Sequence, residues 1–133
     1  MEVVERNFFP KSERLSLKKD IDGLFDVGQS FISYPLRIVY LSDIGVDPSK
    51  SGISVLISVP KKRVKLAVNR NRIKRVIREA LRCNKNMITD FCCLNNIRLS
   101  IAFMYVSNDI LSYSDIEKAI IKALKNIYNI VSK

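Results

Sequence analysis

The clearest pattern of apolar and polar positions in this chain lies between Asn69 and Arg82, a segment without glycine or proline. Apolar residues recur there at the spacing i, i+3, i+4, i+7 and i+8, which places them on one face of an α-helix. These positions are Ile73, Val76, Ile77, Ala80 and Leu81. The sequence therefore predicts an amphipathic helix whose apolar stripe packs against the rest of the molecule.

Apolar patterns elsewhere predict the remaining elements. Residues 1–15 are expected to form an irregular arm, followed by a helix over 17–27 with Ser16 as N-cap and Gly28 after its end. Runs rich in β-branched and other apolar residues predict three strands, over 35–41, 53–59 and 98–106. A short helical piece is expected over 87–94, and a last helix begins at a capping box on either Ser112 or Ser114.

The order of the main elements is thus α-β-β-α-β-α. Helices packed on a small sheet satisfy the apolar faces of both, which is the usual α+β arrangement. At 133 residues, the chain is long enough for one core and short for two. We predict an α+β fold, a single domain over residues 1–133, with a three- to four-stranded sheet packed with helices.

Charge changes the meaning of the amphipathic helix. Residues 61–85 hold eleven Lys or Arg and one acid, Glu79, a balance of +10 that equals the net charge of the whole chain. Like charges one helical turn apart repel by about 0.2–0.5 kcal/mol per pair. Positions opposite the apolar stripe carry Asn71, Lys74, Arg75, Arg78, Arg82 and Lys85. A polyanion, most simply nucleic acid, accounts for this face better than solvent alone.

Several kinds of chemistry are missing from the sequence. The chain has no histidine, and Cys83, Cys92 and Cys93 have no zinc-site spacing, so we interpret them as idle thiols of a reducing cytoplasm. Asp22 and Asp26 are helical neighbours that could hold a hydrated Mg²⁺, although ordinary surface acids have that spacing more often. No apolar run suits a membrane span. We expect no catalytic residue, no metal ligand and no membrane contact.

The residues at the start of the basic helix carry a family resemblance. Residues 67–75 read AVNRNRIKR and continue as VIREALR, after a strand that ends in Val59-Pro60-Lys61-Lys62. This string resembles the signature of the bacterial ribonuclease P protein component, in which an RNR block opens a long helix. The likeness covers residues 12–131. It implies a left-handed β-α-β crossover, contrary to the usual right-handed rule.

The resemblance also implies a function. Proteins of this family join a catalytic RNA in an endoribonuclease that removes the 5′ leader from precursor tRNA. The RNA holds most of the Mg²⁺, and the protein needs no other protein partner. Residues that match the family's RNA-binding positions, together with Arg82 on the same helix face, are Lys61, Lys62, Arg70, Asn71, Arg72, Lys74, Arg75, Arg78 and Arg82. Residues expected to line its leader cleft are Ile21, Phe25 and, on the first predicted strand, Tyr40 rather than Val39.

Two other functions fit the basic helix. A non-enzymatic RNA-binding module would use the same face, but it would not distinguish precursor from mature tRNA. A DNA-binding helix-turn-helix protein fits less well, because a strand and a cationic loop precede the helix where that motif has a partner helix.

Overall fold

The computed structural model describes residues 18–132, with side chains from Ile21 onward. Its elements are α2 (Lys18–Val27), β1 (Gln29–Ser33), β2 (Leu36–Ile44), η2 (Pro48–Lys50), β3 (Gly52–Ser58), α3 (Ala67–Asn84), α4 (Asn86–Leu94), β4 (Ile97–Tyr105) and α5 (Tyr113–Val131). The α+β class and the order of the predicted elements are confirmed. The arm expected over residues 1–15 and the Ser16 cap lie outside the described residues.

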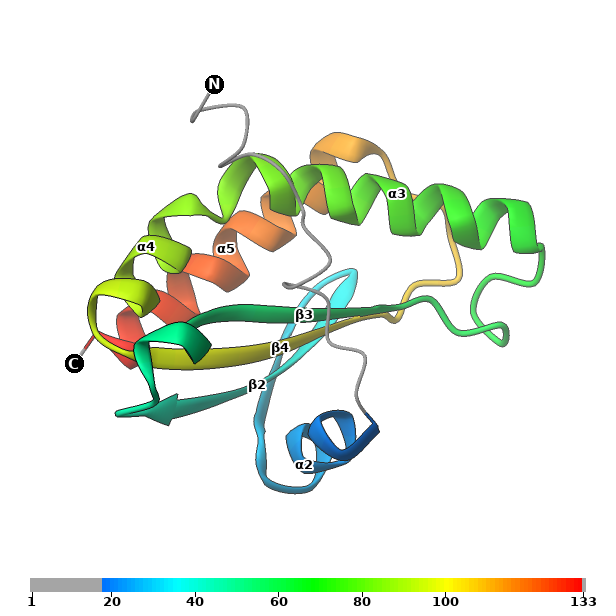
Figure 1. Ribbon diagram of the computed structural model, residues 1–133. Helices are drawn as coiled ribbons and strands as arrows, with labels where there is room; N and C mark the ends of the chain where they lie inside the picture. The colour runs from blue at the N-terminus through cyan, green and yellow to red at the C-terminus, as the bar shows by residue number, and fades with distance from the viewer. Residues whose placement is uncertain (1–17, 133) are drawn as a thin grey trace.

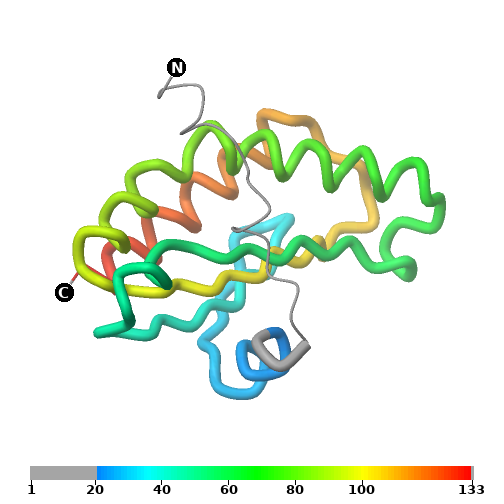
Figure 2. The backbone as a smooth tube through the Cα atoms, in the orientation of Figure 1, coloured from blue at the N-terminus to red at the C-terminus, as the bar shows by residue number. Residues whose placement is uncertain are grey.

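The four strands form one mixed sheet in the order β1-β2-β4-β3. The pairs β1–β2 and β2–β4 are antiparallel, whereas β3 and β4 are parallel, with Gly52 beside Arg98. Parallel neighbours require a crossover, which α3 and α4 supply as the chain leaves β3 and returns as β4 (Figure 2). The left-handed sense of that crossover stays a prediction.

Strand β1 was not predicted from the sequence. It forms an edge hairpin with β2 across Tyr34 and Pro35, which are joined by a cis peptide bond. Four of its five residues are exposed or half-buried, so its sequence lacks the apolar alternation that marks a half-buried strand.

Helices cover the sheet unequally. Figure 1 shows α3, α4 and α5 on one face and the short helix α2 on the other. The main core lies beneath the three helices and includes Ile38, Ile77, Phe103 and Ile120. A smaller core beneath α2 joins Leu24 to Val39 and Ala102. The central strands are therefore buried on both faces where α2 lies.

The predicted helix boundaries are close to those observed. Ser112 is the N-cap of α5, since its hydroxyl accepts a hydrogen bond from the amide of Asp115 at 3.2 Å. Helix α2 ends at Val27, and a side chain at the following Gly28 would meet the carbonyl oxygens of Leu24 and Tyr40 at 2.3 and 2.9 Å. Glycine is required there by this close approach of two backbones.

Candidate nucleic-acid interface

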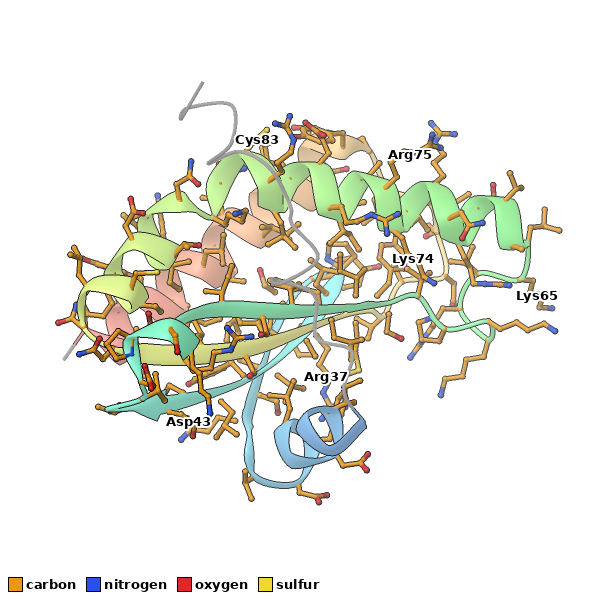
Figure 3. All side chains as sticks on the ribbon, viewed as in Figure 1. Arg37, Asp43, Lys65, Lys74, Arg75 and Cys83 are labelled. Carbon is orange, nitrogen blue, oxygen red and sulfur yellow. The ribbon has the colours of Figure 1, made fainter. Side chains whose placement is uncertain are left out.

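Helix α3 carries the predicted stripe on its buried side. Ile73, Ile77, Ala80 and Leu81 are buried against the sheet and α5, and Val76 is half-buried. The cations on the exposed side of α3 repel one another, and the apolar packing of the buried side therefore holds them in place. Arg75 and Arg78 are exposed, and Figure 3 shows Arg75 pointing away from the sheet while Lys74 projects toward it.

Asn71 and Arg72 are also exposed, as are Lys61 and Lys62 in the connection from β3. The structure thus brings most of the predicted RNA-binding residues onto one helix and the loop before it. Lys85 does not share this surface. It is 3% exposed at the end of α3, so the prediction that it extends the cationic face is wrong.

Arg70 performs a structural task within the interface. Its Nη1 atom donates hydrogen bonds to the carbonyl oxygens of Val64 at 3.0 Å and Lys65 at 2.7 Å. These two bonds tie the first turn of α3 to the basic loop. The guanidinium has five N–H donors, so the remaining ones are still available to an RNA phosphate.

Arg82 is paired within its own helix. It donates hydrogen bonds to both carboxylate oxygens of Glu79, one turn earlier. The hydrogen bond from Arg82 holds the pKa of Glu79 below its ordinary value. The pair partly neutralises this end of α3, so the open cationic surface is strongest between Asn71 and Arg78.

A second candidate surface lies on the face of the sheet beside α2. Phe25 is 43% exposed on that helix. Ile21, Leu41, Leu56 and Met104 are half-buried around the small core. This surface combines an exposed aromatic ring with accessible apolar side chains, which suits contact with unpaired bases.

The prediction that Tyr40 lines this surface is wrong. Tyr40 is 6% exposed and packs in the main core, where its ring meets Phe31 edge-on and its hydroxyl donates to Gln29. Its neighbour Val39 faces α2 instead and is 3% exposed. Successive side chains on a strand point to opposite faces, so a shift of one residue moved the assignment to the wrong side.

Sequence reasoning missed Arg37 at this surface. It shares the face of β2 that carries Val39, is exposed, and lies next to Met104 on β4. Figure 3 shows it close to α2. Its position two residues before Val39 would have identified it, had the strand register been assigned correctly.

The described residues offer little support for a metal site or for a membrane-spanning helix. Asp22 and Asp26 are exposed, and residues 18–132 hold no group of three His, Cys, Asp or Glu side chains that could ligate a metal ion. None of the helices in that range has the length and apolar character needed to span a bilayer. The prediction that Mg²⁺ is held mainly by RNA stays untested.

Comparison with known proteins identifies the family. Residues 9–128 match the family model described as Ribonuclease P. The ribonuclease P protein component of Porphyromonas gingivalis is 43% identical over 117 residues, which cover 88% of this chain and 84% of that protein. The corresponding protein of Chlorobium phaeobacteroides is 35% identical over 106 residues, covering 75% and 73%.

Solved structures agree on the fold. The RNase P protein of Staphylococcus aureus superposes with a TM-score of 0.65 at 22% identity, covering 88% of this chain and 96% of that one. The RNase P protein from Thermotoga maritima gives 0.64 at 21% identity, covering 86% and 96%. With the sequence match over most of its length, the chain belongs to the bacterial ribonuclease P protein family.

Proposed function

We propose that this chain, as the protein subunit of the endoribonuclease ribonuclease P, binds the catalytic RNA through α3 and the 5′ leader of precursor tRNA beside α2. The observation that carries the proposal is the exposed cationic face of α3, fixed over a buried apolar stripe in a chain of this family. Membership of the family makes the chain a partner of the RNase P RNA. Contact with precursor tRNA is the finer part of the proposal.

The surface on α3 and the surface beside α2 suit different parts of an RNA strand. Arg75 and Arg78 offer planar guanidinium groups that bind phosphate with two parallel hydrogen bonds. Phe25 offers a π-face on which an unpaired base can stack, and Arg37 supplies a cation beside it. Figure 1 shows α3 and α2 on different sides of the sheet. A rigid sheet between them would hold the leader at a fixed position relative to the catalytic RNA.

Nothing in this proposal requires the chain to break a bond. Mg²⁺, when bound to the RNA, would activate the attacking water and stabilise the leaving oxygen. The protein contributes the positioning of phosphates and bases, which lowers the entropic cost of bringing substrate to the catalytic RNA.

The test is reconstitution with the cognate catalytic RNA at low Mg²⁺, measured as cleavage of precursor tRNA. Arg75→Ala and Arg78→Ala are expected to weaken binding of the catalytic RNA without changing thermal stability. Lys122→Ala and Lys125→Ala, which remove exposed cations from α5, are the matched controls for charge. A wild-type protein that neither binds the RNA nor improves cleavage would refute the proposal.

The leader contact has its own experiment. Phe25→Ala is expected to weaken binding of precursor tRNA to the assembled enzyme while leaving mature tRNA binding unchanged. Val27→Ala, at an exposed position on the same helix, controls for loss of apolar surface. Equal affinity of the wild-type complex for precursor and mature tRNA would support a general RNA-binding module instead.

A further inference from the structure

A groove of about 410 Å³ lies between two connections that are far apart in the sequence. One wall is the β3–α3 connection with the first turn of α3, and the other is the β4–α5 connection. Figure 1 shows both connections at the same end of the sheet. The lining residues that bear on its chemistry are Lys62, Lys65, Leu66, Asn69, Asn108 and Ile110. Neither Asn108 nor Ile110 belongs to the basic segment or to the family positions considered above.

The first wall is held rigidly. Val64 is buried in the main core, and its amide and that of Arg63 donate to the carbonyl oxygen of Pro60 at 3.1 and 3.0 Å. Arg70 binds the carbonyl oxygens of Val64 and Lys65 from the helix side. These bonds occupy acceptors that would repel a phosphate, and they fix the backbone that carries Lys62, Lys65 and Leu66.

The second wall is anchored by one buried side chain. The Tyr105 hydroxyl donates to the carbonyl oxygen of Asp109 at 2.5 Å and accepts from the amide of Leu111 at 3.2 Å. Tyr105 itself is fully buried. The backbone is therefore bonded on both sides of Ile110, whose side chain is nevertheless 45% exposed.

The groove thus presents three kinds of group together. Lys62 and Lys65 are exposed cations, Asn69 and Asn108 have amides that donate and accept hydrogen bonds, and Leu66 and Ile110 are exposed apolar side chains. A bare phosphate would use the cations and the amide N–H donors but not the apolar side chains. A nucleotide uses all three, with a charged phosphate, hydrogen-bonding base edges and an apolar base face. Its size also suits the volume, since small-ligand sites measure about 300–1,000 Å³.

We propose that this groove binds one unpaired nucleotide of an RNA strand. The phosphate lies toward Lys62 and Lys65, and the base lies against Leu66 and Ile110, with its edge toward an Asn amide. The proposal deepens the function proposed above by adding a base-contacting site that α3 alone does not supply. The strand is either part of the catalytic RNA or part of the precursor leader.

The experiment compares Ile110→Ser with Ile130→Ser. Both residues are isoleucines with 45% of their surface exposed, but Ile130 lies near the end of α5. The probe is a short unstructured RNA oligonucleotide, with inorganic polyphosphate of matched charge as a second probe, each measured by fluorescence competition. Ile110→Ser is expected to weaken oligonucleotide binding roughly three- to tenfold. Polyphosphate binding and the salt dependence of both should not change.

Asn108→Ala provides an independent variant, since it alters the same wall without removing apolar surface. It is expected to weaken the oligonucleotide selectively as well. Lys65→Ala should instead weaken both probes and reduce the slope of log affinity against log salt by about 0.7, the value for one single-strand phosphate contact. Thermal unfolding of each variant confirms that the fold is intact.

Three outcomes would overturn the proposal. The first is wild-type affinity of both Ile110→Ser and Asn108→Ala for the oligonucleotide. The others are equal losses of affinity for oligonucleotide and polyphosphate in Ile110→Ser, or an equal loss of oligonucleotide affinity in Ile130→Ser. Binding of the same variants to the catalytic RNA, and to precursor against mature tRNA, identifies the source of the nucleotide. These results are separate from cleavage by the reconstituted enzyme. The groove can therefore fail while the proposed function stands, and the reverse also holds.

Discussion

Replacing Arg70 by methionine separates the structural role of this residue from its charge. Methionine keeps an unbranched aliphatic stem but has no N–H donor, so the bonds to the carbonyl oxygens of Val64 and Lys65 are lost. The matched control is Arg75→Met, which removes one cation from the exposed side of the same helix. Both variants lower the net charge by one.

The expected loss of stability follows from the two bonds. A hydrogen bond from a charged donor contributes about 1.5–3 kcal/mol when buried. One of these bonds is part-buried and the other exposed, so solvent competes for both, and we expect a total of about 1–2 kcal/mol. Arg75→Met should change the free energy of unfolding by less than about 0.5 kcal/mol, as surface substitutions usually do.

Urea denaturation measures this difference, and RNA binding at several salt concentrations measures its consequence. Arg75→Met should reduce the salt slope by the equivalent of one phosphate contact, about 0.7–0.9. Arg70→Met should reduce it further, because Lys62 and Lys65 lose their fixed positions. Equal unfolding free energies and equal salt slopes for the two variants would show that Arg70 does not hold the loop.

Three other predictions concern stability and reactivity. Ile77→Asp places a carboxylate at a fully buried position and should abolish the cooperative unfolding transition, whereas Ile130→Asp at an exposed position should preserve it. Because the folded-state pKa of Glu79 lies below its ordinary value, principally through the hydrogen bond from Arg82, the stabilisation is present above the unfolded pKa near 4.5. It is lost as pH falls through the folded pKa, and Glu79→Gln should flatten thermal midpoints measured across that acidic range. Burial raises the pKa of Cys92 to about 11, so mass spectrometry after alkylation at neutral pH should find this thiol unmodified until denaturant is added.

Sequence patterns predicted the elements whose two sides differ most in polarity. Helix α3 has an apolar stripe beneath and cations above, so its position and its buried residues were predicted almost completely. The sequence predicted the position of strand β2, but it did not show which of its side chains face α2 and which face the main core. Leu36, Ile38, Val39 and Tyr40 are all buried because cores lie on both faces of the strand. Where both faces are apolar, alternation disappears, and the register error at Tyr40 follows from that loss.

The contacts of individual polar groups were beyond prediction for a different reason. Arg70 binds carbonyl oxygens whose positions exist only after the Pro60–Lys65 loop has folded. The burial of Lys85 depends on the turn from α3 to α4. Composition and periodicity carry no information on such contacts, because they report the sides of elements rather than the paths of the loops between them.

The crossover between β3 and β4 has a consequence for how the interface comes into existence. Gly52 pairs with Arg98 in the sheet, and α3 lies within the long segment that joins these strands. Non-local pairings of this kind close large loops and slow the folding reaction. During synthesis, β4 and then α5 leave the ribosome after α3, so the apolar stripe of the amphipathic helix stays uncovered until α5, its main packing partner, arrives. The surface proposed to contact RNA is therefore among the last parts of the chain to mature, and RNA affinity during refolding reports the docking of α5 on α3.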